Sequence, residues 1–325
     1  MELYEKNGNI LYILNVLKKY SDEEHILSSN DISEKIKEIY DVSVDSRTVR
    51  RNITLLNEKF GYDISTWNDN KKGYYLIKNP ETDFESGEIR AIIDVFSYSN
   101  FVPDILAKEV INKCKNMQTI YENEKLNNYQ ISMKDTKTDN LEIIKNIEDI
   151  NNAIYENKKI SFDYWKYDLT LTLEKKIVKN PVVSPYKIVY ALQSFYLICL
   201  TDGKNELYTY RLDRMKNINI LKQKASDKFS DSEVDFFIKN NVAMFSGDAE
   251  QIEVKCHMDL LDNVIELFGK DIKLKRLNND YFNMKLYTNM KGFRYWILRN
   301  IEQVEVISPE VLKKDINNVL KEHIK

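Results

Sequence analysis

The spacing of apolar residues changes near residue 158, and this change most constrains the fold. Upstream, as in residues 141–155, apolar residues recur every three or four positions, which is typical of amphipathic helices. Downstream, short apolar runs such as ISFDYW and FYLICL are separated by Asn-Pro, Ser-Pro and Asp-Gly pairs, which is typical of strands. We therefore predict a multidomain α+β protein.

The first 80 residues predict three helices followed by a hairpin. Helical spacing covers 9–19 and 31–40, and a third helix starts at Asp45 or Ser46 and stops at Gly61. The runs YDISTW and KGYYLI flank a polar turn, NDNKK, which favours a β-hairpin. This order predicts a winged helix-turn-helix DNA-binding domain over residues 1–80.

The third predicted helix has an apolar stripe at Val49, Ile53 and Leu56. If that stripe faces inward, the outer faces carry residue types that bind bases and phosphates: Ser46, Arg47, Arg50, Arg51, Asn52 and Thr54. Lys71 and Lys72 lie in the predicted wing, where we expect phosphate or minor-groove contacts. The alternative is a solvated helix face that carries arginines without binding DNA.

The rest of the chain divides into three predicted regions. Residues 81–157 read as a helical linker interrupted at Pro103, and 158–225 read as short strands that suggest a small curved β-barrel. Residues 226–325 show a strand–helix–strand–helix–strand order followed by a last helix. That order predicts a small C-terminal α+β domain.

Composition limits the partners and the compartment. A net charge of −3 argues against attraction to nucleic acid by the whole molecule, so any DNA contact needs a local basic face. Three separate cysteines without a CxxC pair fit a reducing compartment. The sequence shows neither a signal peptide nor a run of about 20 apolar residues. We expect a cytoplasmic protein without a membrane partner.

An enzymatic role is not expected. The three histidines are in no motif with a nucleophile or metal ligands, and the eight glycines form neither GxGxxG nor a P-loop. The carboxylates are abundant, but no pair stands out as acid and base. We therefore predict no catalytic residues, no metal and no cofactor.

The stretch FYLICLTDGKNELYTYRLDRM, residues 195–215, ends in a charged cluster after strand-like runs. Charges removed from water are costly unless they are paired, so this cluster is a salt-bridged structural feature or a binding site. On a continuing strand, Arg211 and Asp213 would share one face, while Tyr210 and Arg214 would share the other. Periodicity leaves both interpretations open.

The motifs SPYKIV, FYL and YRLDRM, within residues 184–215, resemble those of the WYL-domain family of bacterial transcriptional regulators. Phe195 stands where the family has tryptophan. The resemblance implies an Sm/SH3-like β-barrel between a winged helix-turn-helix and a C-terminal extension called WCX. FGKD, RYWILRN and VEVISPEVL look like that extension.

The resemblance also implies a sensor function, in which the WYL domain binds an effector that modulates operator binding. The implied effector is single-stranded DNA, another nucleic acid or a nucleotide-like molecule. The candidate ligand-binding residues are Tyr164, Ser184, Tyr186, Tyr196, Tyr210, Arg211, Asp213 and Arg214. Two-fold symmetric operators favour a homodimer. The alternative function is a non-transcriptional accessory factor that binds RNA or a protein complex.

Overall fold

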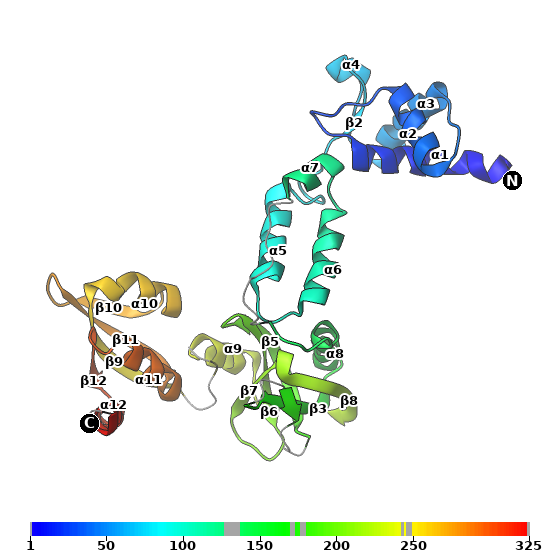
Figure 1. Ribbon diagram of the computed structural model, residues 1–325. Helices are drawn as coiled ribbons and strands as arrows, with labels where there is room; N and C mark the ends of the chain where they lie inside the picture. Colours follow the sequence, from blue (N-terminus) through cyan, green and yellow to red (C-terminus); the bar gives the residue numbers. More distant parts are fainter. Residues whose placement is uncertain are drawn as a thin grey trace. The chain divides into compact units, whose positions relative to one another are not determined.

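The computed structural model describes residues 2–126, 137–169, 173–175, 180–241, 244 and 249–323. The chain forms two compact units (Figure 1). The first contains Met1–Ser99 and Pro103–Lys137, and the second contains Asn100–Val102 and Thr138–Lys325. The described residues form helices and three separate sheets, which confirms the predicted mixed α+β class.

The N-terminal elements follow the predicted order. Their bounds are α1 (Glu2–Tyr20), α2 (Ser29–Tyr40), α3 (Ser46–Phe60), β1 (Ile64–Ser65), α4 (Trp67–Asn70) and β2 (Tyr75–Leu76). Ser28 caps α2, because its hydroxyl accepts the N–H of Asp31 while the Asp31 carboxylate accepts the N–H of Ser28. The three helices share one apolar core, which includes Ile13, Leu17, Ile36, Val49 and Ile53.

Strands β1 and β2 pair antiparallel, as the predicted hairpin requires, but residues 67–70 of the connection form the short helix α4. Thr66 and Asp69 make a capping box that starts this helix. The Asn70 side chain then accepts the backbone N–H groups of Lys72 and Gly73. A Cβ at Gly73 would lie 2.4 Å from the Leu27 carbonyl oxygen. Only glycine therefore allows this return of the chain.

The helices α5 (Ser86–Tyr98), α6 (Asp104–Lys115) and α7 (Ile120–Lys125) complete the first unit. Ile89, Ile93 and Ile111 are buried where α5 packs against α6. The predicted interruption at Pro103 is confirmed, since Pro103 caps α6 in an extended conformation.

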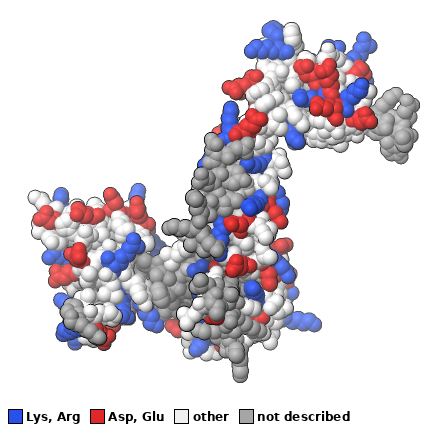
Figure 2. Space-filling view, viewed as in Figure 1, with Lys and Arg blue, Asp and Glu red and all other residues white. Residues whose placement is uncertain are grey.

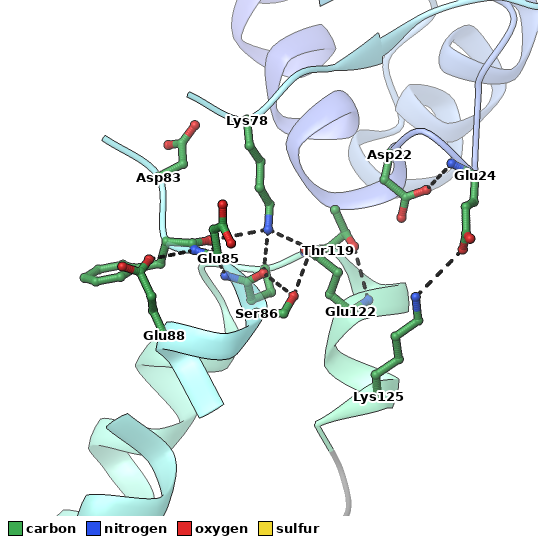
Figure 3. Close-up of polar contacts among 12 residues, drawn as sticks. Asp22, Glu24, Lys78, Asp83, Glu85, Ser86, Glu88, Thr119, Glu122 and Lys125 are labelled. Atoms are coloured by element: carbon green, nitrogen blue, oxygen red, sulfur yellow. Dashed lines mark hydrogen bonds and ion pairs between the residues drawn. The ribbon is translucent and has the colours of Figure 1, made fainter. Parts of the chain in front are cut away.

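A polar joint connects the end of β2 to the starts of α5 and α7 (Figure 3). The Lys78 ammonium group lies 2.7 Å from Glu122 Oε1 and 2.7 Å from Gln118 Oε1. Ser86 also donates to Glu122 Oε1. Burial raises the pKa of the Glu122 carboxyl, but hydrogen bonds from Lys78 and Thr119 outweigh burial and hold that pKa below its ordinary value. The carboxylate at this joint is therefore stabilised in its charged form.

The second unit begins with helix α8 and a bent sheet. Their bounds are α8 (Ile143–Tyr155), β3 (Lys158–Tyr167), β4 (Leu173–Lys175), β5 (Val182–Ala191), β6 (Ser194–Thr201), β7 (Leu207–Arg211), the 3₁₀ turn η1 (Leu212–Arg214) and β8 (Met215–Lys224). The sheet order is β4-β3-β5-β6-β7, and β8 pairs with β3. The described residues show no pairing between β7 and β8, so the closed barrel is not confirmed.

Helix α8 packs against β3, β5 and β8 of this sheet. Its buried stripe is Ile143, Asn146, Ile150 and Ala153. Leu141 and Ile144, although apolar and at helical spacing, are exposed, whereas the polar Asn146 is buried. A buried asparagine in that stripe needs hydrogen-bond partners on the sheet.

The C-terminal residues form helices around a four-stranded sheet of order β10-β11-β9-β12. The strands are β9 (Ala249–His257), β10 (Lys273–Arg276), β11 (Tyr281–Asn289) and β12 (Val304–Ser308). The helices of this sheet are α10 (Leu261–Phe268), α11 (Met290–Arg299) and α12 (Glu310–His323), with the 3₁₀ turn η2 (Met258–Leu260) before α10. Helix α9 (Asp231–Lys239) instead packs against the preceding sheet, where Val234 is buried with Ile198 and Leu207. The predicted alternation is present, and α9 and β10 are additional elements.

Candidate functional site

Helix α3 is fixed at both ends by local interactions. At its start, the Asp45 carboxylate accepts the backbone N–H groups of Arg47 and Thr48, each at 2.9 Å. The hydroxyl of Thr48 is the main cause of the lowered pKa of the Asp45 carboxyl. At its end, Gly61 takes a left-handed conformation with φ of 71°. The helix therefore presents a defined face.

The inward stripe of α3 is confirmed, since Val49, Ile53 and Leu56 are buried. Four predicted DNA-binding residues are exposed on the other faces: Arg47, Arg50, Arg51 and Thr54. Within the described residues, the side chains of the three arginines make no ion pair. These guanidinium groups keep all their donors available for an external anion.

Ser46 and Asn52, the other predicted DNA-binding residues of α3, are half-buried and have intramolecular partners. Ser46 donates its hydroxyl to the side-chain oxygen of Asn30 on α2, which ties the starts of the two helices together. Asn52 donates its amide to the Thr48 carbonyl at 2.9 Å. Their role in DNA binding stays a prediction.

Lys71 and Lys72 are exposed at the end of α4. Lys71 donates to the Asn68 carbonyl at 2.9 Å. Figure 2 shows Lys and Arg atoms gathered at the α4 end of the N-terminal helices, while Asp and Glu atoms cover another part of the same face. The basic residues of this face are thus concentrated in one part, as DNA binding requires in a protein with a net charge of −3.

The charged end of the 195–215 stretch is a paired turn. Strand β7 stops at Arg211, and η1 begins with Leu212. The Arg211 guanidinium donates from Nε to Asp213 Oδ1 at 3.0 Å and from Nη2 to Asp213 Oδ2 at 2.8 Å. This pairing and the negative charge of Asp213 raise the pKa of Arg211. The prediction that a strand continues through Asp213 is wrong, because the backbone turns before it.

Tyr164 and Tyr196 lie beside this ion pair. The Tyr164 hydroxyl accepts the Arg211 backbone N–H at 3.3 Å. Burial raises the pKa of both tyrosines above the ordinary value, and the positive charges of Arg211 and Arg214 offset only part of this rise. The Nε of Arg214 is buried and has no hydrogen-bond partner among the described residues. These five residues, Tyr164, Tyr196, Arg211, Asp213 and Arg214, form what we call the sensor cluster.

The other predicted ligand-binding residues have partners elsewhere on the sheet. Ser184 accepts the backbone N–H of Ser226 at 2.8 Å, and the Tyr186 hydroxyl donates to the Ser226 carbonyl at 3.0 Å. Tyr210 shares a 3.3 Å hydrogen bond with Thr201, and its ring meets Tyr164 edge to face. Ser184 and Tyr186 therefore hold the segment after β8.

Sequence reasoning missed Asn140 and Asn146, which are both buried. Both bind the backbone of residues 211–215, which we call the sensor turn after the role proposed below. Asn140 donates to the carbonyls of Asp213 at 3.0 Å and Met215 at 2.7 Å. Asn146 donates to the Met215 carbonyl at 2.7 Å. Asn146 recurs in register with Ile143 and Ile150, and this polar residue at an inward helical position was the available signal.

The family comparison matches this part of the chain. Residues 145–220, from within α8 into β8, match the family model described as the WYL domain. This chain therefore contains a WYL domain. Its WYL domain contains all eight predicted ligand-binding residues and Asn146, whereas Asn140 lies just before the match.

Two solved structures are similar to this WYL-domain protein. One is proteasome accessory factor B/C (PafBC) of Arthrobacter aurescens, with 12% identity, 98% of this chain covered and a TM-score of 0.28. This chain spans 49% of the PafBC chain. The other, titled a CRISPR Cas-related protein, has 15% identity over 98% of this chain and 83% of its own, with a TM-score of 0.38. None of the curated proteins compared with this chain matches it.

Among the described residues, no helix combines the length and apolarity needed to cross a bilayer. No group of three or more His, Cys, Asp and Glu residues is placed to hold a metal ion within those same residues.

Proposed function

We propose that this WYL-domain protein is a DNA-binding transcriptional regulator whose WYL domain senses an effector and modulates operator binding. The observation that carries the proposal is the exposed set of Arg47, Arg50 and Arg51 on α3, which has no ion-pair partner among the described residues and lies outside the buried stripe. In this proposal the N-terminal helices and the β1–α4–β2 segment act as a winged helix-turn-helix, with α3 in the major groove.

Residue chemistry supports α3 as the reading element. Arginine can donate two hydrogen bonds to O6 and N7 of guanine, which gives base specificity. Lys71 and Lys72 supply charges that phosphates can neutralise, which gives affinity without specificity. Both contributions are local, so they are compatible with a net charge of −3.

The sensor cluster supports an anionic effector, namely a nucleic acid or a nucleotide-like molecule. Asp213 orients the Arg211 guanidinium, and the buried Nε of Arg214 is a donor without a partner among the described residues. Arginine next to tyrosine suits phosphate pairing together with base stacking. The proposed role of the cluster is binding rather than catalysis.

The wider proposal includes a homodimer that acts in the cytoplasm. Paired α3 helices would read two half-sites of a symmetric operator. The C-terminal α+β residues would serve as the WCX extension. The proposal keeps the expectation that no cofactor or metal takes part.

The proposal is tested by selecting bound fragments from sheared duplex genomic DNA with the full-length protein. We expect wild-type protein to enrich a discrete sequence, and protein with Arg50→Ala and Arg51→Ala to enrich none, although it keeps the wild-type circular dichroism spectrum. A parallel selection from total RNA covers the alternative. Enrichment of RNA but not of duplex DNA would favour the accessory-factor function and reject the proposal.

A further inference from the structure

Two segments of chain enter the second compact unit, Asn100–Val102 and the segment that begins at Thr138. The Thr138 backbone N–H donates to the Asn100 carbonyl at 3.0 Å, so the two entry segments are hydrogen-bonded to each other. Phe101 is buried, and its ring meets Phe195 edge to face with centroids 4.8 Å apart. Both entry segments are therefore anchored inside the second unit.

The entry segment at Thr138 is also bonded to the sensor turn. The Asp213 carbonyl accepts the amide of Asn140 at 3.0 Å and the hydroxyl of Thr138 at 3.4 Å. The Asn140 amide also donates to the Met215 carbonyl at 2.7 Å. Asn140 thus spans the turn and binds the carbonyls on both sides of Arg214.

These bonds are costly to lose, because Asn140 is 1% exposed and water does not replace the missing partners. The hydrogen bonds of Asn140 also continue into the proposed effector site through Asp213. Asn140 holds the Asp213 backbone, and the Asp213 carboxylate holds the Arg211 guanidinium. An anion that draws the Arg211 guanidinium away from Asp213 would therefore disturb the hydrogen bonds between the Asp213 backbone and Asn140.

We propose that Asn140 is a positioning residue that couples occupancy of the sensor cluster to the entry segment at Thr138. The inference rests on the proposed function and deepens it, because it names the contact through which an effector acts. An effector changes an equilibrium only by its different affinity for two arrangements of the protein. Here those arrangements differ in whether the Arg211–Asp213 turn and the Thr138 segment are hydrogen-bonded through Asn140.

The test compares full-length wild-type protein with Asn140→Ala, and uses Asn151→Ala, at an exposed position of α8, as the matched control. The probe is a 5′-phosphorylated single-stranded oligonucleotide of about ten nucleotides. Three quantities are measured: probe affinity, hydrogen exchange at the Thr138 amide, and operator affinity with and without probe.

In wild type and Asn151→Ala we expect the probe to change the Thr138 exchange rate and to change operator affinity by about fivefold or more. The Asn140→Ala protein should still bind the probe and the operator, but neither the Thr138 rate nor operator affinity should respond. A full response in Asn140→Ala would overturn the proposal. If Asn140→Ala does not fold, Asn140→Ser replaces it, with a reduced response expected and an unchanged response overturning the proposal.

An arm without probe separates this inference from the proposed function. In Arg211→Ala the turn loses its side-chain pair, so we expect faster exchange at the Thr138 amide than in wild type. If wild type does not bind the probe, the proposed effector class is rejected. The Arg211→Ala measurement still tests whether the sensor turn is coupled to the Thr138 segment. Unchanged exchange at Thr138 in Arg211→Ala would then refute it.

Discussion

The arginines of α3 and those of the sensor turn are held in opposite ways. Arg50 and Arg51 project from a helix whose position is set by its own apolar stripe, and no carboxylate of the described residues pairs with them. Arg211 is bound to the buried carboxylate of Asp213, and the turn that carries this pair is held by Asn140. The first arrangement suits recognition of a variable external surface, and the second suits detection of an anion that perturbs an existing pair.

The largest expected effect is a loss of operator affinity without a loss of thermal stability. Arg50→Ala combined with Arg51→Ala should weaken operator binding by about 2–6 kcal/mol, since each lost base contact costs about 1–3 kcal/mol. Thermal stability should stay near wild type, because both side chains are exposed and unpaired among the described residues. Anisotropy titration and a melting curve check this, and unchanged operator affinity would contradict the assignment of α3.

The next effect concerns the sensor turn. Asp213→Ala should lower the free energy of unfolding by about 2–3 kcal/mol, because it removes two hydrogen bonds to a charged group and leaves Arg211 unpaired. Asp202→Ala is the control, since the Lys159–Asp202 pair is more exposed and should contribute less than about 1 kcal/mol. Urea denaturation measures the free energy of unfolding of both variants. Equal decreases would show that the Arg211–Asp213 pair stabilises the fold no more than the Lys159–Asp202 pair does.

A smaller, pH-dependent effect is expected at the joint in Figure 3. Glu122→Gln should cost about 1–2 kcal/mol of stability at pH 7, because the Lys78 hydrogen bond loses its negative acceptor. The lowered pKa of Glu122 stabilises the fold above its ordinary value of 4.5, and this contribution is lost as the pH falls through the folded-state pKa.

The free-energy difference between wild type and Glu122→Gln should therefore shrink below pH 4.5. Glu124→Gln is the neighbouring exposed control and should show no such dependence. A difference that stays constant from pH 7 to acid would show that the Glu122 charge does not stabilise the joint.

The smallest expected effect is at the predicted wing. Lys72→Ala should reduce operator affinity by less than about 1 kcal/mol and lower the salt slope of binding by about 1, as expected for one phosphate contact. Titrations at several salt concentrations measure the slope. An effect as large as that of the α3 double variant would mean that α4 reads bases.

The α3 face was predictable because its determinants are local. Asp45, the Val49–Ile53–Leu56 stripe and Gly61 lie within one short stretch, so helical spacing was enough to orient the arginines. The capping box of Thr66 and Asp69 was equally visible, yet the polar turn was interpreted as a hairpin loop.

The sensor turn was less predictable because its determinants are distant in sequence. The motif resemblance found the right stretch, but alternation placed Asp213 on a continuing strand. The actual turn depends on carbonyls bound by Asn140, more than 70 residues away.

We propose above that an anion at the sensor cluster changes how α3 binds DNA. The most direct measurement is operator affinity with and without a 5′-phosphorylated single-stranded oligonucleotide, in wild type and in Arg211→Ala combined with Arg214→Ala. We expect the oligonucleotide to shift operator affinity by about fivefold or more in wild type, and not at all in the double variant. An equal shift in both proteins would contradict the proposal.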